Sequence, residues 1–181
     1  MTIRPATPAD APAIAHIHVA TWQATYKGIV PEAYLSSLNE ADFTTRWTEW
    51  LHGDASIPIC VAEEQQALTG FAAGGPIRKP TSGYDAELYA LYVLPNAQQT
   101  GAGRRLVAHI AQNLRNQGRT DMLVWVLRDN PATAFYRHLG ATLVTEDTVD
   151  IGGALLPDLA FGWPLTAPAF THSEHTETSP S

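Results

Sequence analysis

Cysteine is almost absent from the sequence, and its scarcity excludes two kinds of covalent or metal stabilisation. A single cysteine, Cys60, occurs among 181 residues. No disulfide can therefore form within the chain, and no zinc site built from several cysteines is available. Because unpaired cysteines are typical of reducing compartments, we expect a cytoplasmic protein.

Positive charge and long apolar runs are also scarce. Lys and Arg number 11 against 18 Asp and Glu, for a formal net charge of −7, whereas nucleic-acid-binding proteins usually present a basic surface to the phosphates. No stretch approaches the roughly 20 apolar residues that cross a bilayer, and the first residues lack the apolar core of a secretory signal. We therefore expect neither nucleic acid nor membranes as partners.

The chain is nevertheless apolar enough to fold around a core of its own. Hydrophobic residues make up 45% of the sequence, and 181 residues is a size typical of one domain. The last residues are rich in Thr, Ser, Glu, Pro and His, which offset little of the entropy lost on ordering. The sequence predicts one domain over residues 1–166 and a disordered tail over residues 167–181.

Hydrophobic periodicity predicts a mixture of helices and strands in that domain. Helical spacing is found from Ile14 to Tyr26, in residues 31–52 with a break near Asn39, from Leu106 to Leu114, and in a short segment at 131–139. The strand signals lie at residues 2–5, 57–63, 68–73, 87–93, 122–127, 141–146 and 157–163. Gly74-Gly75-Pro76 is expected to end the third of these strands.

A glycine-containing loop between a strand and a helix carries the clearest chemical signal. Residues 98–103 read Gln-Gln-Thr-Gly-Ala-Gly, directly before the predicted helix. Backbone N–H groups at a helix N-terminus, together with the helix dipole, bind phosphate without a lysine. Gly101 and Gly103 allow close approach of the backbone to a ligand, and Arg104 and Arg105 add positive charge.

Two common phosphate loops are excluded by the residues after these glycines. A Rossmann loop would need Gly or Ala three residues after Gly103, where Leu106 stands. A Walker loop would end in Gly-Lys-Ser/Thr. Instead, Val93-x-Pro95-x-x-Gln98-x-x-Gly101-x-Gly103 resembles the acetyl-CoA signature of the GCN5-related N-acetyltransferase (GNAT) superfamily, and the resemblance covers all of the chain but the tail.

The resemblance implies an α/β (α+β) fold with a mixed, mostly antiparallel central sheet, splayed between its fourth and fifth strands and flanked by about four helices. Acetyl-CoA would occupy the gap. The resemblance assigns the thioester and pantetheine to the backbone of Leu91 and Val93. It assigns the pyrophosphate to the amides of Gln98, Gln99, Thr100, Gly101, Ala102, Gly103 and Arg104.

A second segment, from Asn130 to Gly140, resembles a later motif of the same family. The resemblance makes Tyr136 a general acid that protonates the leaving CoA thiolate, although an aromatic residue here could also be an ordinary core residue. Six residues separate Asn130 from Tyr136, where the family commonly has seven. Either Asp129 or Asn130 could therefore fill the polar cofactor-binding position.

The acceptor amine must lose a proton before it attacks, and the sequence offers one candidate base. Some family members carry Glu on the fifth strand, but that position here is Val124 or Trp125. Glu87, at the start of the central strand, could act through water, or it could be a solvated charge. Strand alternation predicts that Glu87, Tyr89 and Leu91 share one face, and Tyr89 could line the acceptor site.

The end of the first helix is the expected wall of the acceptor site. Trp22 and Tyr26 lie one turn apart there and could stack on a substrate or enclose an ammonium group; a core aromatic stripe is the alternative. His16 and His18 lack a second cluster of ligands. No metal is therefore expected.

Together these residues predict an acetyl-CoA-dependent N-acetyltransferase that acts by direct attack of a primary amine in a ternary complex. The sequence leaves the acceptor open: a small-molecule amine or a peptide N-terminus would fit, with a weak preference for cationic amines. A homodimer is compatible with the sequence. The alternative is a non-catalytic acyl-CoA-binding sensor or regulatory module, which would share the same loop.

Overall fold

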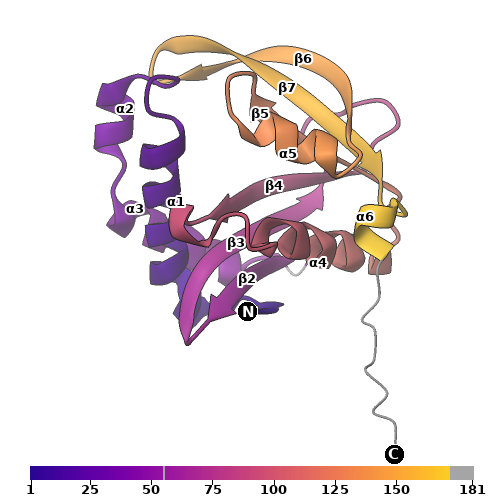
Figure 1. Cartoon of the computed structure of the whole chain (residues 1–181), viewed down its shortest axis with the longest axis horizontal. Helices are drawn as coiled ribbons and strands as arrows, with labels where there is room; N and C mark the ends of the chain where they lie inside the picture. Colours follow the sequence, from indigo (N-terminus) through magenta and orange to yellow (C-terminus); the bar gives the residue numbers. More distant parts are fainter. Residues whose placement is uncertain (55, 172–181) are drawn as a thin grey trace, which may run out of the picture.

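The computed structural model describes residues 1–54 and 56–171, and its centre is one seven-stranded sheet with helices on both faces (Figure 1). The strand order is β1-β2-β3-β4-β5-β7-β6. The strands are β1 (Thr2–Pro5), β2 (Ile59–Glu64), β3 (Ala67–Pro76), β4 (Ala86–Val93), β5 (Asp121–Leu127), β6 (Thr142–Ile151) and β7 (Ala154–Pro164). Only β4 and β5 pair in parallel, which confirms the predicted mixed, mostly antiparallel sheet.

The helices follow the predicted order, with one addition at the end. They are α1 (Ala11–Thr25), α2 (Glu32–Ser37), α3 (Glu40–His52), α4 (Ala102–Asn116), α5 (Ala132–His138) and α6 (Pro168–Thr171), with 3-10 turns at Pro8–Asp10 and Pro95–Ala97. Asn39 accepts a hydrogen bond from the Asp42 amide at 2.9 Å and caps α3. The predicted break near Asn39 is therefore the gap between two helices.

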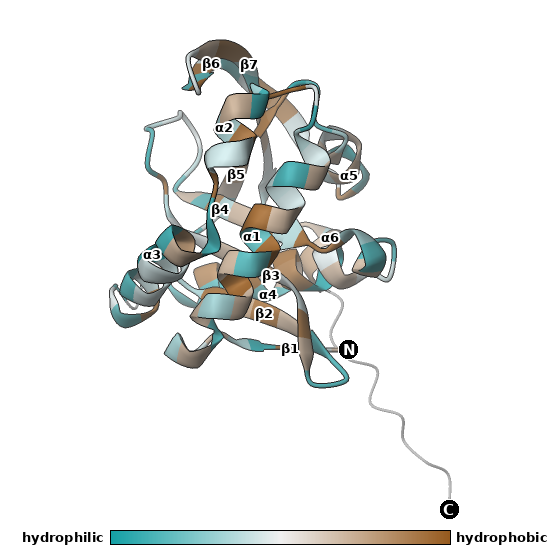
Figure 2. Cartoon of the chain, turned by 90° about the vertical axis from the view of Figure 1, so that its left-hand side faces the viewer, coloured by the Kyte–Doolittle hydropathy of each residue, from teal (hydrophilic) through white to brown (hydrophobic). Residues whose placement is uncertain are grey.

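Two apolar layers hold the helices against the sheet. On one face, α4 buries Leu106, Val107, Ile110 and Leu114 against the strands. On the other face, Ile14 and Ile17 of α1 and Trp47 of α3 pack with Val61 and Phe71. Figure 2 shows strongly apolar residues along β2 and β3, between these helices. The buried residues of α1 and of α4 recur every three or four positions, and this spacing predicted the two helices from the sequence.

The sheet is splayed between β4 and β5. The two strands pair at only three positions, Ala86 with Met122, Glu87 with Leu123 and Leu88 with Val124. β4 then continues to Val93 and β5 to Leu127 without further pairing to each other. The carboxyl halves of both strands therefore face a gap, as the resemblance implied.

A β-bulge in β4 corrects one expectation. Ala73 of β3 pairs with Ala90 and Gly74 pairs with Leu88, so Tyr89 is an extra residue that interrupts the alternation. Leu91 packs with the α4 layer, whereas Ala90 and Tyr92 pack with the α1 layer. Glu87 and Leu91 therefore do not point to the same face, contrary to the simple alternation predicted from the sequence.

Three strands also differ in length from expectation. β3 continues through Gly74 and Gly75 to Pro76, which still pairs with β4, whereas these residues were predicted to end the strand. β6 and β7 are longer than predicted and form an extended ribbon. The turn between them packs Gly152 against the Tyr34 ring of α2, so the ribbon reaches the first helices (Figure 1).

The start of the predicted tail is ordered. Residues 168–171 form α6, and Phe170 is only 5% exposed, with its ring centroid 5.6 Å from that of Trp163. The expectation of disorder from residue 167 is therefore wrong for these residues, because Phe170 completes the core beneath α4. Residues 172–181 lie outside the described residues. No helix in the described part of the chain is long and apolar enough to cross a membrane.

Gly74 lies where α4 packs closely against β3. A Cβ built there would lie 2.7 Å from Ile110 Cγ2 and 3.0 Å from the Glu87 carbonyl oxygen. Because a β-branched side chain and a backbone atom cannot move aside cheaply, Gly74→Ala should lower the free energy of unfolding by about 1–3 kcal/mol. Urea denaturation measures the change, and an unaltered midpoint would show that α4 can shift away without cost.

Candidate active site

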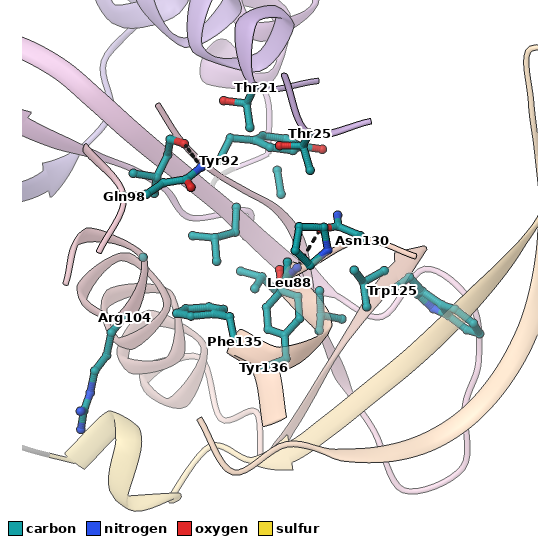
Figure 3. A pocket seen from close by; sticks show the side chains of 18 of the residues that line it. Thr21, Thr25, Leu88, Tyr92, Gln98, Arg104, Trp125, Asn130, Phe135 and Tyr136 are labelled. Atoms are coloured by element: carbon teal, nitrogen blue, oxygen red, sulfur yellow. Dashed lines mark hydrogen bonds between the residues drawn. The ribbon is translucent and has the colours of Figure 1, made fainter. Parts of the chain in front are cut away.

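The gap between β4 and β5 opens into a cavity of about 540 Å³. Its walls come from both splayed strands, from the loop before α4, from α1 and from α5. Figure 3 shows Arg104 and Trp125 at opposite ends of this lining. The lining residues are Thr21, Thr25, Tyr26, Leu88, Tyr89, Ala90, Leu91, Tyr92, Val93, Gln98, Gln99, Gly101, Gly103, Arg104, Val124, Trp125, Val126, Asn130, Pro131, Ala132, Phe135 and Tyr136.

The loop before α4 forms one end of the cavity, and its backbone adopts positive φ angles at two positions. Gly101 is the N-cap of α4 with φ +87°, and Gln99 also has a positive φ of 63°. The Gln98 side chain donates to the Val93 carbonyl at 3.1 Å and ties the loop to the end of β4. The unpaired amides at the start of α4, with the helix dipole, make this end suited to an anion.

Five of the seven predicted pyrophosphate residues line the cavity, namely Gln98, Gln99, Gly101, Gly103 and Arg104. The other two hold the loop. Ala102 is buried in the core, and the Thr100 hydroxyl donates to the Ala97 carbonyl at 2.8 Å. The assignment of each amide to pyrophosphate stays a prediction.

Leu91 and Val93 line the cavity from β4. Since the pairing with β5 ends at Leu88, the edge of β4 that faces the gap offers backbone groups to a ligand. The bulge at Tyr89 lies just before this stretch, and bulges commonly aim backbone or side chains at a site. The geometry suits an extended amide-containing ligand lying along β4.

Of the two candidates for the polar position of the second motif, Asn130 is the one that lines the cavity, and its role in binding the cofactor stays a prediction. Its side chain is 6% exposed and lines the cavity, whereas Asp129 is exposed to solvent. Asn130 Nδ2 donates to the Tyr26 hydroxyl at 2.9 Å, and its Oδ1 accepts from the Ala132 amide at 2.8 Å. Asn130 therefore precedes α5, holds its first residue Ala132 and connects it to Tyr26, the residue directly after α1.

Tyr136 projects from α5 into the cavity and is 5% exposed. Burial raises the pKa of Tyr136 far above its usual value, and the neighbouring Tyr26 and Tyr92 raise it further. Its hydroxyl makes no hydrogen bond to any described residue, yet it is not among the fully enclosed polar atoms. The hydroxyl keeps its proton at neutral pH and can be reached from the cavity.

Glu87 lies outside the cavity lining, and its carboxylate is neutralised. Glu87 is 1% exposed and accepts hydrogen bonds from the amide and Nε of Arg78, both at 3.1 Å, and from Arg78 Nη2. Tyr89 does line the cavity, and the Arg78 guanidinium lies 4.4 Å from its ring centroid. The Tyr89 hydroxyl donates to the Pro76 carbonyl. Arg78 therefore contacts both the Glu87 carboxylate and the Tyr89 ring.

The end of α1 contributes different residues from those the sequence favoured. Tyr26 lines the cavity, but Trp22 does not; its Nε1 donates to the Tyr92 hydroxyl at 2.9 Å. Thr21 and Thr25 line it instead, and the buried Thr21 hydroxyl has no hydrogen-bond partner among the described residues. Their four-residue spacing was visible in the sequence, but weighing only aromatic residues missed it.

The remaining candidate groups have structural roles. Burial, with a smaller effect from Arg46, lowers the pKa of His18 to about 4, and its ring stacks on Tyr92 at 4.8 Å. His16 contacts Glu40 at 2.8 Å. Burial raises the pKa of Cys60 to about 12, so it is a poor nucleophile. Within residues 1–54 and 56–171, no group of three His, Cys, Asp or Glu residues could hold a metal ion.

Comparison with known proteins gives this site a family. The model of the acetyltransferase (GNAT) family matches residues 17–141. An uncharacterized N-acetyltransferase, YuaI, of Bacillus subtilis is 40% identical over 166 residues, which cover 91% of this chain and 93% of that protein. The L-amino acid N-acyltransferase MnaT of Escherichia coli is 27% identical over 154 residues, 84% of this chain and 85% of its own length.

A solved structure adds the fold and a cofactor. The structure of yncA, a putative acetyltransferase from Salmonella typhimurium determined with its cofactor acetyl-CoA, superposes with a TM-score of 0.68 at 26% identity. The match covers 100% of this chain and 98% of that one. The chain therefore belongs to the GNAT acetyltransferase family and is an acetyl-CoA-dependent N-acetyltransferase.

Proposed function

We propose that the chain transfers the acetyl group of acetyl-CoA to the primary amine of a small, amino-acid-like acceptor by direct attack in a ternary complex. One observation carries the proposal. A single cavity extends from the start of α4, which suits an anion, to Trp125 at the opposite end (Figure 3), and Tyr26 also lines it. Cofactor and acceptor can therefore meet in the gap between β4 and β5 without a covalent enzyme intermediate.

Most of the contacts to acetyl-CoA would come from backbone groups of the chain. The amides of residues 98–104 would hold the pyrophosphate, with Arg104 adding positive charge. The pantetheine amides would pair with the open edge of β4 near Leu91 and Val93, in the manner of an added strand. Asn130 would contribute through its position beside α5, where it lines the same cavity.

The chemical step uses two groups of this chain. The Leu91 N–H would stabilise the oxygen of the tetrahedral intermediate, and the Tyr136 hydroxyl would protonate the thiolate that leaves. Glu87 was the base predicted from the sequence, acting through water, but it lies outside the cavity lining and is bound by Arg78, which weakens that role. Its ion pair with Arg78 also supports a positioning role, in which Glu87 fixes Arg78 against Tyr89 at the cavity wall.

The acceptor end supports a small amine that also carries negative charge. Lys79 Nζ lies 5.1 Å from the centroid of the Trp125 ring, which lines the cavity, and it also contacts the Asp147 carboxylate, so an acceptor carboxylate would share Lys79 with Asp147. Tyr26 packs with Leu35 of α2, Leu127 of β5 and Val149 of β6, which narrows the cavity beside Tyr26. The E. coli relative is named as acting on L-amino acids, and an amino acid would bring both an amine and a carboxylate.

Thiol release tests the proposal. The chain, acetyl-CoA and single members of an acceptor set would be mixed, with free CoA thiol measured over time; the set would include L-amino acids, a dipeptide, a polyamine and an aminoglycoside. Release above the acceptor-free background is expected with L-amino acids. If acetyl-CoA binds but no acceptor raises the release, the sensor or regulatory alternative replaces the proposal. A preference for the dipeptide would shift the acceptor to a peptide N-terminus.

A further inference from the structure

Asp158 lies on β7 of the β6–β7 ribbon; it is not itself among the residues that line the cavity, but its charge acts on Tyr26, which is. In the sheet register it stands opposite Leu127 of β5 and opposite Asp147 of β6. Directly opposed residues in antiparallel strands share a face, and Leu127 packs with Tyr26 on that face. Trp125, two residues before Leu127, shares it too. Asp158 is therefore next to two residues that line the cavity, Tyr26 and Trp125.

The other carboxylates near this end are already paired. Glu87 is bound by Arg78, and Asp147 contacts Lys79. Glu146 pairs with Arg128 at 2.6 Å and lies on the opposite face of the ribbon, since its register partner is Leu159. Each of these three carboxylates would have to release its own Lys or Arg partner before it could bind the ammonium group of a ligand.

Asp158 differs from them in having no cationic partner in contact. Among residues 1–54 and 56–171, it forms no ion pair and no hydrogen bond to another side chain; the Leu159 amide donates to its carboxylate, and Lys79, which contacts Asp147, acts on it only through its charge. It is half-buried, and a half-buried carboxylate without a cation is costly to keep ionised. The position would be stabilised by a cation supplied by a ligand.

On the basis of the proposed function, we propose that Asp158 binds the ammonium group of the acceptor and removes the proton that must leave before attack. Two N–H protons leave the nitrogen in the whole reaction. The first passes to the Asp158 carboxylate and then to solvent. The C–N bond then forms and the C–S bond breaks. Tyr136 gives its hydroxyl proton to the CoA thiolate that leaves, and the second N–H proton of the nitrogen restores the Tyr136 hydroxyl.

The surroundings tune Asp158 for this exchange. Burial raises the pKa of Asp158 to about 6; the Leu159 amide and Lys79 oppose the shift, and Glu87 adds to it. The groups that face Asp158 are Lys79 from the β3–β4 loop, Glu87 from β4, Asp147 from β6 and Tyr26 from α1. A base with a pKa near the working pH is ionised and still able to hold a proton.

The dependence of kcat/KM on pH tests the role. For the wild-type chain with acetyl-CoA and the best L-amino acid, kcat/KM should rise about tenfold per pH unit below about 6 and then level off. Asp158→Asn should lower kcat/KM by about 10²–10⁴-fold on the plateau and abolish that acidic limb. The dissociation constant of acetyl-CoA should stay unchanged, since Asp158 lies on β7 and is not among the residues that line the cavity around the loop before α4.

Glu146→Gln is the matched control, since it makes the same carboxylate-to-amide change one strand away on the opposite face. Glu146→Gln should keep the wild-type kcat/KM on the plateau and the same fall of kcat/KM at acidic pH. The proposal is overturned if Asp158→Asn retains wild-type kcat/KM, or if it is slower but keeps the same limb, as a purely structural residue would. A wild-type chain that releases no thiol with any acceptor would refute the proposed function itself, before any variant is compared.

Thermal unfolding separates loss of chemistry from loss of fold. The pKa of Asp158 rises from 3.8 to about 6 on folding, so the folded state binds the proton more tightly and its stability falls as pH rises from about 4 to about 6. Asp158→Asn removes that cost. At pH 7.5 the Tm of the variant should equal or exceed the wild-type value, together with its loss of activity; a lower Tm would contradict the assigned environment of Asp158.

Discussion

Replacement of Tyr136 by Phe should lower kcat for acetyl transfer by about 10²-fold or more, while the affinity for acetyl-CoA is kept. The hydroxyl makes no hydrogen bond to a described residue, so its removal breaks no contact that stabilises the fold. Without it the CoA thiolate must leave unprotonated or wait for water. Thiol release under saturating acceptor and acetyl-CoA measures kcat directly.

Tyr84→Phe supplies the control for this experiment, because Tyr84 is half-buried but does not line the cavity. It makes the same change of one hydroxyl and should leave kcat within about twofold of wild type, the ordinary range for a substitution away from the site. Full turnover of Tyr136→Phe at every pH, with cofactor still bound, would remove Tyr136 from the chemical step.

Replacement of Gly101 by Val should weaken acetyl-CoA binding by about tenfold or more. Gly101 begins α4 with φ +87°, a conformation that a β-branched residue adopts only under strain of about 1–3 kcal/mol. The variant must either keep the strain, with its side chain at the lining of the cavity, or turn the amides of the loop away from the pyrophosphate. Isothermal titration with acetyl-CoA measures the change.

Gly118 provides a control with a similar positive φ. It follows α4 at the other end with φ +82°, and, as at Gly101, no atom lies within 4 Å of an added Cβ. Gly118→Val should therefore lower stability by a similar amount and leave the affinity for acetyl-CoA intact. If both variants lose affinity equally, the effect would come from strain in α4 and not from the pyrophosphate loop.

The cofactor half of the site could be predicted because its chemistry is local. The glycine at the start of α4 and the segment from Asn130 to Tyr136 each act through a short stretch of chain, so their spacing carries the information. That Asn130, and not Asp129, lines the cavity needed the structure, since the Asn130 side chain is held by the hydroxyl of Tyr26, 104 residues earlier in the chain. Spacing alone left both residues open.

The acceptor half depends on contacts between distant segments, and the sequence predicted it less well. The face of Leu91 is set by a bulge that appears only when β3 and β4 are paired. Glu87 loses its free charge to Arg78, which arrives on a loop. Asp158 had no motif to mark it; its surroundings are assembled from α1, β4, β6 and the β3–β4 loop. No single window of sequence contains that environment.

Because β4 pairs with β5 over only three positions, hydrogen exchange of the β4 amides should report whether the gap is occupied. Beyond Leu88, the edge of β4 that faces the gap has no strand beside it, so amides on that edge should exchange their hydrogens with deuterated solvent rapidly. A bound pantetheine arm would occupy the place of the missing strand and slow that exchange. Mass spectrometry of a peptide spanning residues 89–93 could then follow occupancy of the gap without any turnover.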